Sequence, residues 1–169
     1  MDAAEKNGTG LHGLVLNICT VWALCGGAVL LAVVGINLVS IIGAATIGVA
    51  FPGDFEMTEM GVAIAAFSFL PYCQIAGLNV TADIFTARAS RFWLAVFALL
   101  AALVALIFSG LLLWRMYLGM LDQRAYDYTT AILQVPVWWG FAPCLISLAL
   151  LVLAAFASVL DAISDFSKR

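Results

Sequence analysis

Charge is the scarcest property of this sequence. Only 10% of its 169 residues are charged, while 65% are hydrophobic, and a soluble globular domain usually carries about 25% charged residues. This composition excludes a freely soluble fold. Seven basic residues are outnumbered by ten acidic ones, which leaves a net charge of −3. No basic field is therefore present to hold the phosphates of a nucleic acid, and nucleic-acid binding is excluded.

The residue types of common enzyme and cofactor sites are also missing. Cys19, Cys25, Cys73 and Cys144 form no Cys-x-x-Cys pair and fall in apolar stretches, where cysteine behaves as a small hydrophobe rather than a reactive thiol. His12 is the only histidine, which argues against a haem or metal anchor, and no Gly-rich phosphate loop occurs. We expect no catalytic, cofactor-binding or metal-binding residues. A four-helix membrane redox enzyme or cofactor anchor is kept as the alternative function.

Four long segments lack Asp, Glu, Lys and Arg altogether. A bilayer core about 30 Å thick needs roughly 20 apolar residues in a helix, and backbone amides in hydrocarbon must bond within their own helix. Each segment is long enough. The sequence predicts an all-α integral membrane protein, a single domain over residues 1–169, with transmembrane helices at about 14–39, 57–78, 92–117 and 135–160. Residues 40–50 either extend the first helix or lie along the interface.

The flanks of these spans predict their orientation, because basic residues favour the cytoplasmic side. One side collects Lys6, Arg88, Arg91, Lys168 and Arg169, and the other only Arg115 and Arg124. Both termini are therefore expected to be cytoplasmic. Aromatic rings gather around the connection between the third and fourth spans, where we expect them at the headgroup level: Trp114, Tyr117, Tyr126, Tyr128, Trp138 and Trp139.

Small residues at helical spacing predict where the helices approach closely, unless they only reflect how common Ala and Gly are in membrane helices. They are Ala28, Ala32 and Gly35 on the first span, Gly61 and Ala65 on the second, Ala98, Ala102, Ala105 and Ser109 on the third, and Ser147, Ala154 and Ser158 on the fourth. Pro71 and Pro143 lie inside spans and should bend them. Pro136 is expected to start the fourth helix.

Three acidic residues open the second span. Asp54 can cap the helix amides, and Glu56 and Glu59 share a face near the positive end of the helix dipole. Either these carboxylates only cap the helix, or Glu59 is drawn into contact with a partner protein, since an ionised carboxylate deep in lipid costs about 2.5–3.5 kcal/mol.

The far end of the second span carries further polar residues. Gln74 either repairs the backbone at Pro71 or contributes to substrate passage. Asp83 is interpreted as the N-cap of a short interfacial helix, with Arg88 and Arg91 facing headgroups or a partner. The cores of the spans contain no ionisable residue that could carry protons or ions, which favours a supporting role in a larger assembly over independent ion-coupled transport.

Four stretches, taken in order, resemble one family of transporter subunits. They are the turn at residues 52–56 with Glu59 behind it, residues 69–74, residues 79–85 and residues 133–139. With the four-span topology, they resemble the small Q-type (DctQ-like) membrane subunit of tripartite ATP-independent periplasmic (TRAP) transporters. The chain departs from that pattern in having Asn37, Ser40 and Gly43, without a basic residue, at the end of the first helix.

The resemblance implies an assembly of three parts in the cytoplasmic membrane of a bacterium or archaeon. A periplasmic substrate-binding protein (P-type) captures a small organic anion, a large permease subunit (M-type) moves it with an ion gradient, typically sodium, and the small subunit is a scaffold without cofactor. The loop at 121–134 is either a docking edge for the binding protein or an ordinary solvated loop. The candidate partner-interface residues are Asp54, Glu56, Glu59, Gln74, Asp83, Arg88, Arg91, Asp122, Arg124, Asp127, Trp138 and Trp139.

Overall fold

The computed structural model describes residues 11–78 and 91–167, and these residues are almost entirely helical. They form α1 (Leu11–Ile47), α2 (Asp54–Ile75), α4 (Arg91–Ala125) and α5 (Trp138–Ser167). Three stretches, His12–Ile47, Val96–Ala125 and Trp138–Ser164, are long and apolar enough to cross a membrane. An all-helical fold with these three candidate spans is therefore confirmed. The crossing of α2, which carries three carboxylates in its first two turns, stays a prediction.

Three helices end later than the sequence predicted, and one of them is α5, which continues to Ser167 instead of residue 160. Helix α1 continues to Ile47, so residues 40–47 extend the first helix instead of lying along the interface. It stops at Gly48, whose φ of +70° is the left-handed conformation that commonly ends helices. Helix α4 continues to Ala125 instead of residue 117. Helix α5 begins at Trp138, and Pro136 lies in the turn before it, where its carbonyl accepts the N–H of Trp139 at 3.1 Å.

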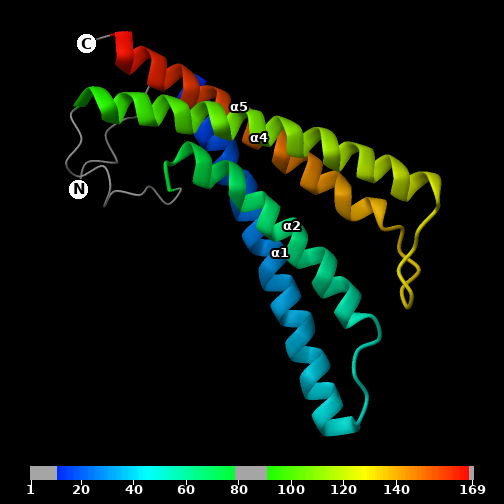
Figure 1. The fold of residues 1–169 in the computed structure, drawn as a ribbon. Helices are drawn as coiled ribbons and strands as arrows, with labels where there is room; N and C mark the ends of the chain where they lie inside the picture. Colours follow the sequence, from blue (N-terminus) through cyan, green and yellow to red (C-terminus); the bar gives the residue numbers. More distant parts are fainter. Residues whose placement is uncertain (1–10, 79–90, 168–169) are drawn as a thin grey trace.

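The helices are arranged as a row (Figure 1). Helix α2 packs against α1 on one side and α5 on the other, α5 packs against α4, and α1 meets α5 only lightly, which gives the order α1, α2, α5, α4 across the molecule. Helices α2 and α5 start at the same end and run parallel. Because a row covers each helix only in part, large apolar side chains stay exposed along both edges, as at Leu31 on α1 (74% exposed) and Ile107 on α4 (70%).

Helices α1 and α2 approach closely where one of them carries glycine. A Cβ added to Gly26 would lie 2.5 Å from the Cβ of Ser68, and one added to Gly61 would overlap the side chain of Val33. Gly61 and Ala65 are buried, which confirms the packing face predicted for the second span.

The packing face predicted for the first span is wrong. Ala28 and Ala32 are exposed and Gly35 is only half-buried. The buried positions of α1 are instead Val15, Cys19, Gly26, Val33 and Ser40. The last four are seven residues apart, the repeat that keeps one stripe against a neighbouring helix over many turns.

On the other two helices the predicted packing faces are confirmed in part. Ala102 and Ser109 on α4, and Ser147 and Ala154 on α5, are buried, although Ala98 is exposed. The indole N–H of Trp22 on α1 donates to the Ser147 hydroxyl at 2.8 Å, and that hydroxyl donates to the Pro143 carbonyl at 2.9 Å. A polar contact thus ties α1 to α5 beside the proline.

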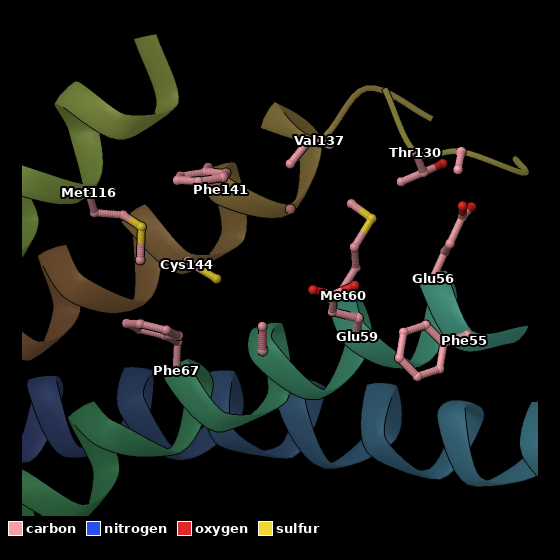
Figure 2. Close-up of a pocket in the computed structure, with 13 residues that line it drawn as sticks. Phe55, Glu56, Glu59, Met60, Phe67, Met116, Thr130, Val137, Phe141 and Cys144 are labelled. Atoms are coloured by element: carbon pink, nitrogen blue, oxygen red, sulfur yellow. The ribbon is translucent and has the colours of Figure 1, made fainter. Parts of the chain in front are cut away.

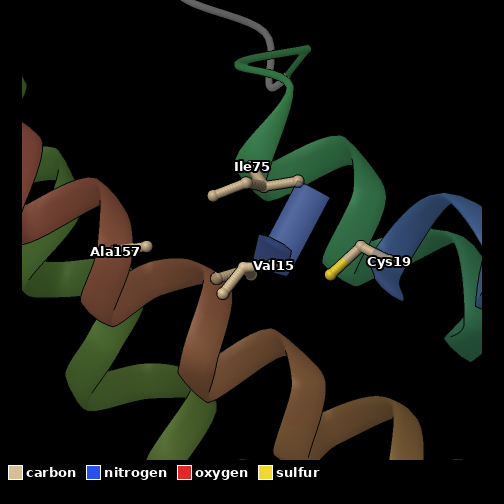
Figure 3. Packing of buried hydrophobic residues seen from close by; sticks show 5 residues of the cluster. Val15, Cys19, Ile75 and Ala157 are labelled. Atoms are coloured by element: carbon tan, nitrogen blue, oxygen red, sulfur yellow. The ribbon is translucent and has the colours of Figure 1, made fainter. Parts of the chain in front are cut away.

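An apolar cluster joins α1, α2 and α5 at the end of the molecule where α1 begins and α5 ends, here called the terminal end (Figure 3). It consists of Val15, Cys19, Ile75, Ala154 and Ala157. Nearby, Nδ1 of His12 lies 2.5 Å from a carboxylate oxygen of Asp161. The described ends of the chain are therefore held side by side.

Candidate functional site

The two connections at the opposite end of the molecule are locked together. We call this structure, residues 48–56 with residues 126–137, the rim. Glu56, in the first turn of α2, accepts hydrogen bonds from the N–H groups of Ile132 at 2.7 Å and Leu133 at 3.0 Å. Beside it, Gly53 has a φ of +82°, and a Cβ there would lie 2.5 Å from Cγ of Leu133. One carboxylate and one glycine therefore join segments that are distant in sequence.

The surroundings of Glu56 favour its ionised form. The N–H of Leu133 lowers the pKa of the Glu56 carboxyl most, and Ile132, the Thr130 side chain and Ala131 lower it further, although partial desolvation acts in the opposite direction. Hydrogen bonds to a carboxylate stabilise its charge. The rim is therefore held by an ionised group at neutral pH.

A polar network inside the α1–α2 hairpin supports the rim. The Ser40 hydroxyl donates to the Asp54 carboxylate and accepts the N–H of Phe51 at 3.1 Å. One turn earlier on α1, the Asn37 amide donates to the Thr58 hydroxyl at 2.7 Å, and that hydroxyl donates to the Asp54 carbonyl at 2.7 Å. Asn37 and Ser40 thus bind α2, a role that the sequence analysis missed. Their three-residue spacing within an apolar helix was the available signal.

Asp54 also serves its own helix. Its carboxylate accepts the N–H of Phe55 at 2.7 Å, which confirms that it binds a helix amide, although Gly53 holds the N-cap position.

The connection between α4 and α5 is a small ordered loop. Val137 donates its N–H to the Tyr128 carbonyl at 2.9 Å, and Thr130 donates to the Val135 carbonyl at 2.9 Å. Asp127 and Gln134 adopt positive φ values of 49° and 54°. These bonds, with those to Glu56, give the loop a defined surface.

Aromatic and charged side chains flank this loop on the adjoining turns of α4 and α5. The Arg124 guanidinium lies 5.6 Å from the centre of the Trp138 ring, within the range of a cation–π contact. Trp138 meets Trp139 edge to face at 6.1 Å. Asp122, Asp127 and Tyr126 are exposed. The position of these rings at the headgroup level stays a prediction.

An apolar groove of about 530 Å³ runs inward from the rim between α2 and α5, with α4 at its inner end (Figure 2). Met60, Phe67, Met116, Phe141 and Cys144 supply carbon and sulfur to its walls. The Glu59 carboxylate also lies at the groove.

Glu59 differs from its two acidic neighbours, which bind other groups of the described structure. Among residues 11–78 and 91–167, no side chain or backbone group forms a hydrogen bond or ion pair with it. Asp54 and Glu56 are both hydrogen-bonded. The expectation that Glu59 contacts a partner protein stays a prediction.

The structure brings most of the predicted interface residues to the rim end: Asp54, Glu56, Glu59, Asp122, Arg124, Asp127, Trp138 and Trp139. Gln74 lies half-buried near the other end of α2. Asp83 and Arg88 lie outside the described residues, as does the side chain of Arg91, the first residue of α4. Within the described ranges, no cluster of three or more His, Cys, Asp or Glu residues could hold a metal ion.

Comparison with known proteins gives a family assignment. The family model described as "Tripartite ATP-independent periplasmic transporters, DctQ component" matches residues 33–165, which include the last part of α1, all of α2 and α4, and nearly all of α5. No curated protein and no solved structure matches the chain significantly. The matched family consists of multi-pass membrane components of transporters and is not enzymatic, so the redox-enzyme alternative is set aside. The chain belongs to the DctQ component family of TRAP transporters.

Proposed function

We propose that this chain braces the large M-type permease subunit of a TRAP transporter and extends the surface on which the periplasmic binding protein docks. The row of helices is the observation that carries this proposal. The four described helices form a row instead of a closed bundle, and its two edges, α1 and α4, present exposed apolar side chains. Such a plate needs either lipid or another subunit along each edge. Uptake of a small organic anion then depends on ion-coupled sites in the large subunit.

We propose that the large subunit seats on one edge of the row and that lipid covers the other. Tryptophan substitutions at matched exposed positions test this, Leu31→Trp on α1 and Ile107→Trp on α4. A large side chain is tolerated against fluid lipid but not in a packed interface. We expect one variant to lose the large subunit in mild-detergent copurification and the other to keep it. If both variants lose the large subunit, or if both keep it, the result contradicts an interface on a single edge of the row.

Orientation follows from the predicted cytoplasmic termini. The terminal end then faces the cytoplasm and the rim faces the periplasm, in a bacterial or archaeal cytoplasmic membrane. Asp122, Arg124 and Asp127 lie at the rim end, where a soluble protein can reach them, and we propose them as the docking edge.

Charge reversal tests this edge. In Asp122→Lys with Asp127→Lys, we expect uptake to need a higher concentration of binding protein, because complementary charge mainly increases association rate. Copurification of the large subunit should not change. Unchanged uptake over a full titration of the binding protein would leave this as an ordinary solvated loop.

Reconstitution tests the non-catalytic role. Sealed vesicles containing only this chain should accumulate no small organic acid under a sodium or proton gradient, whereas vesicles with the large subunit and binding protein should do so. Gradient-driven accumulation by the chain alone would refute the proposal.

A further inference from the structure

We propose that the groove between α2 and α5 binds one acyl chain of a phospholipid whose headgroup carries a primary ammonium, such as phosphatidylethanolamine, and that Glu59 binds this ammonium. The site requires only that the helices lie in a bilayer. It is independent of which edge of the row meets the large subunit.

The length of the groove fits a lipid chain. On α2 its lining extends from Phe55 to Phe67, a rise of about 18 Å at 1.5 Å per residue. One leaflet of a hydrocarbon core about 30 Å thick is roughly 15 Å deep. The groove thus runs along the helices for about one leaflet and begins at the rim, where a headgroup would lie. Its volume of about 530 Å³ is typical of sites for small molecules.

The lining changes in character along this length. Its inner part is formed by Phe67, Met116 and Cys144, and its outer part includes Glu56, Glu59 and Thr130. Methionine and phenylalanine provide an adaptable apolar surface without hydrogen-bonding demands. An amphiphile with an apolar tail and a polar head matches this order of side chains.

The charges identify the headgroup. Glu56 already accepts two backbone N–H groups, whereas Glu59 has no partner among the described residues. An ionised carboxylate beside hydrocarbon is costly unless a donor or cation reaches it. A primary ammonium supplies both the charge and N–H donors. An anionic glycerol headgroup would be repelled.

A cation stands near the same opening. Val137 lines the groove, and the next residue, Trp138, carries the Arg124 guanidinium against its ring. The Arg124 guanidinium thus adds a positive charge at the same end of the molecule, which favours the phosphate of a zwitterionic headgroup over an ammonium alone.

Native mass spectrometry of lipid retained by the full-length chain tests the proposal. The chain is placed in nanodiscs of equal phosphatidylethanolamine and phosphatidylglycerol, then transferred to mild detergent. We expect the wild type to retain the ethanolamine lipid in about tenfold excess, because one charge-assisted contact separates the two lipids. Glu59→Gln should reduce this ratio to near one. Asp122→Asn, which removes an exposed carboxylate outside the groove lining, should keep the wild-type ratio.

A second variant tests the groove itself. Ala63 lines the groove and is exposed, so Ala63→Phe fills it without displacing a buried side chain. It should retain several-fold less of both lipids, while unfolding at the wild-type temperature shows that the chain is folded. If Ala63→Phe is unstable, Ala63→Leu replaces it.

Two results would overturn the proposal. The first is equal retention of both lipids by the wild type, and the second is an unchanged lipid preference in Glu59→Gln. If Glu59→Gln also loses the copurifying large subunit in the second case, the carboxylate is assigned to a protein cation.

Discussion

Two adjacent glycines on α1 should respond to alanine in opposite directions. At Gly26 an added methyl group would lie 2.5 Å from the Cβ of Ser68, whereas at Gly27 nothing lies within 4 Å. Carbon atoms pack at about 3.5–4.0 Å, so Gly26→Ala must separate α1 from α2 by roughly 1–1.5 Å. The Ser68 Cβ is fixed to its backbone and cannot turn away. We expect a loss of about 1–3 kcal/mol of stability, typical of overpacking.

Gly27→Ala has only the helix backbone to affect. Replacing an unhindered helical glycine by alanine stabilises by about 0.5–1 kcal/mol. The two variants therefore make the same chemical change in the same helix, but their expected changes in stability have opposite signs. We propose measuring both by titrating the full-length chain in mild detergent with dodecyl sulfate and following helicity by circular dichroism.

A compensating change completes this design. Ser68→Gly removes the Cβ that Gly26→Ala would meet, and the Ser68 hydroxyl donates within its own helix, to the Ile64 carbonyl at 2.8 Å. The double variant Gly26→Ala with Ser68→Gly should therefore lose less stability than the sum of the losses in the two single variants. If Gly26→Ala and Gly27→Ala shift the midpoint equally and in the same direction, the close approach of these helices is refuted.

Three further variants probe the rim and the α1–α5 contact. Because the fold lowers the pKa of Glu56 below its ordinary value of 4.5, the ionised carboxylate stabilises the fold above that pH, and this stabilisation is lost as the pH falls through the folded pKa. In a pH series of unfolding midpoints, Glu56→Gln should therefore remove the corresponding drop in stability at acid pH. Persistence of that drop in Glu56→Gln would refute the role of the carboxylate. Gly53→Ala should lower the stability of the fold more than Gly48→Ala does. Both glycines have positive φ, but of the two only Gly53 faces a side chain, that of Leu133. Equal decreases in the thermal unfolding temperature would contradict the close contact between Gly53 and Leu133. Trp22→Phe should cost about 0.6 kcal/mol, the mean for interhelical hydrogen bonds in a membrane protein, and no loss in the same detergent titration would argue against that bond.

Helix content was predictable because it depends on local composition. A segment free of charge and longer than a bilayer is wide has few alternatives to a helix. The ends of the helices were less predictable. Residues 40–47 are apolar and rich in Gly and Ala, and they become helical in a hairpin where Ser40 binds Asp54 and a Cβ at Gly43 would lie 2.8 Å from the Val49 carbonyl.

The rim was beyond the reach of sequence reasoning for a different reason. Glu56 was identified as a cap or interface residue, but its partners Ile132 and Leu133 offer backbone N–H groups, and any residue except proline carries such a group. The side chains of Ile132 and Leu133 therefore give no signal of these two hydrogen bonds. The stripe on α1 failed similarly, because Ala28 and Gly26 are both small residues and only the crossing with α2 decides which faces inward.

The placement of these contacts explains how a thin row can stay rigid. At the rim end, α2 is tied to the α4–α5 loop through Glu56 and to α1 through Ser40. At the terminal end, the apolar cluster joins α1, α2 and α5. Helices α1, α2 and α5 are thus joined at both ends, and separating two of them in the middle would break these contacts. Helix α4 is held by its packing against α5 and by the loop that follows it. Large apolar side chains can then remain on the edges without loosening the fold, and those edges are the surface that a larger subunit and the surrounding lipid require.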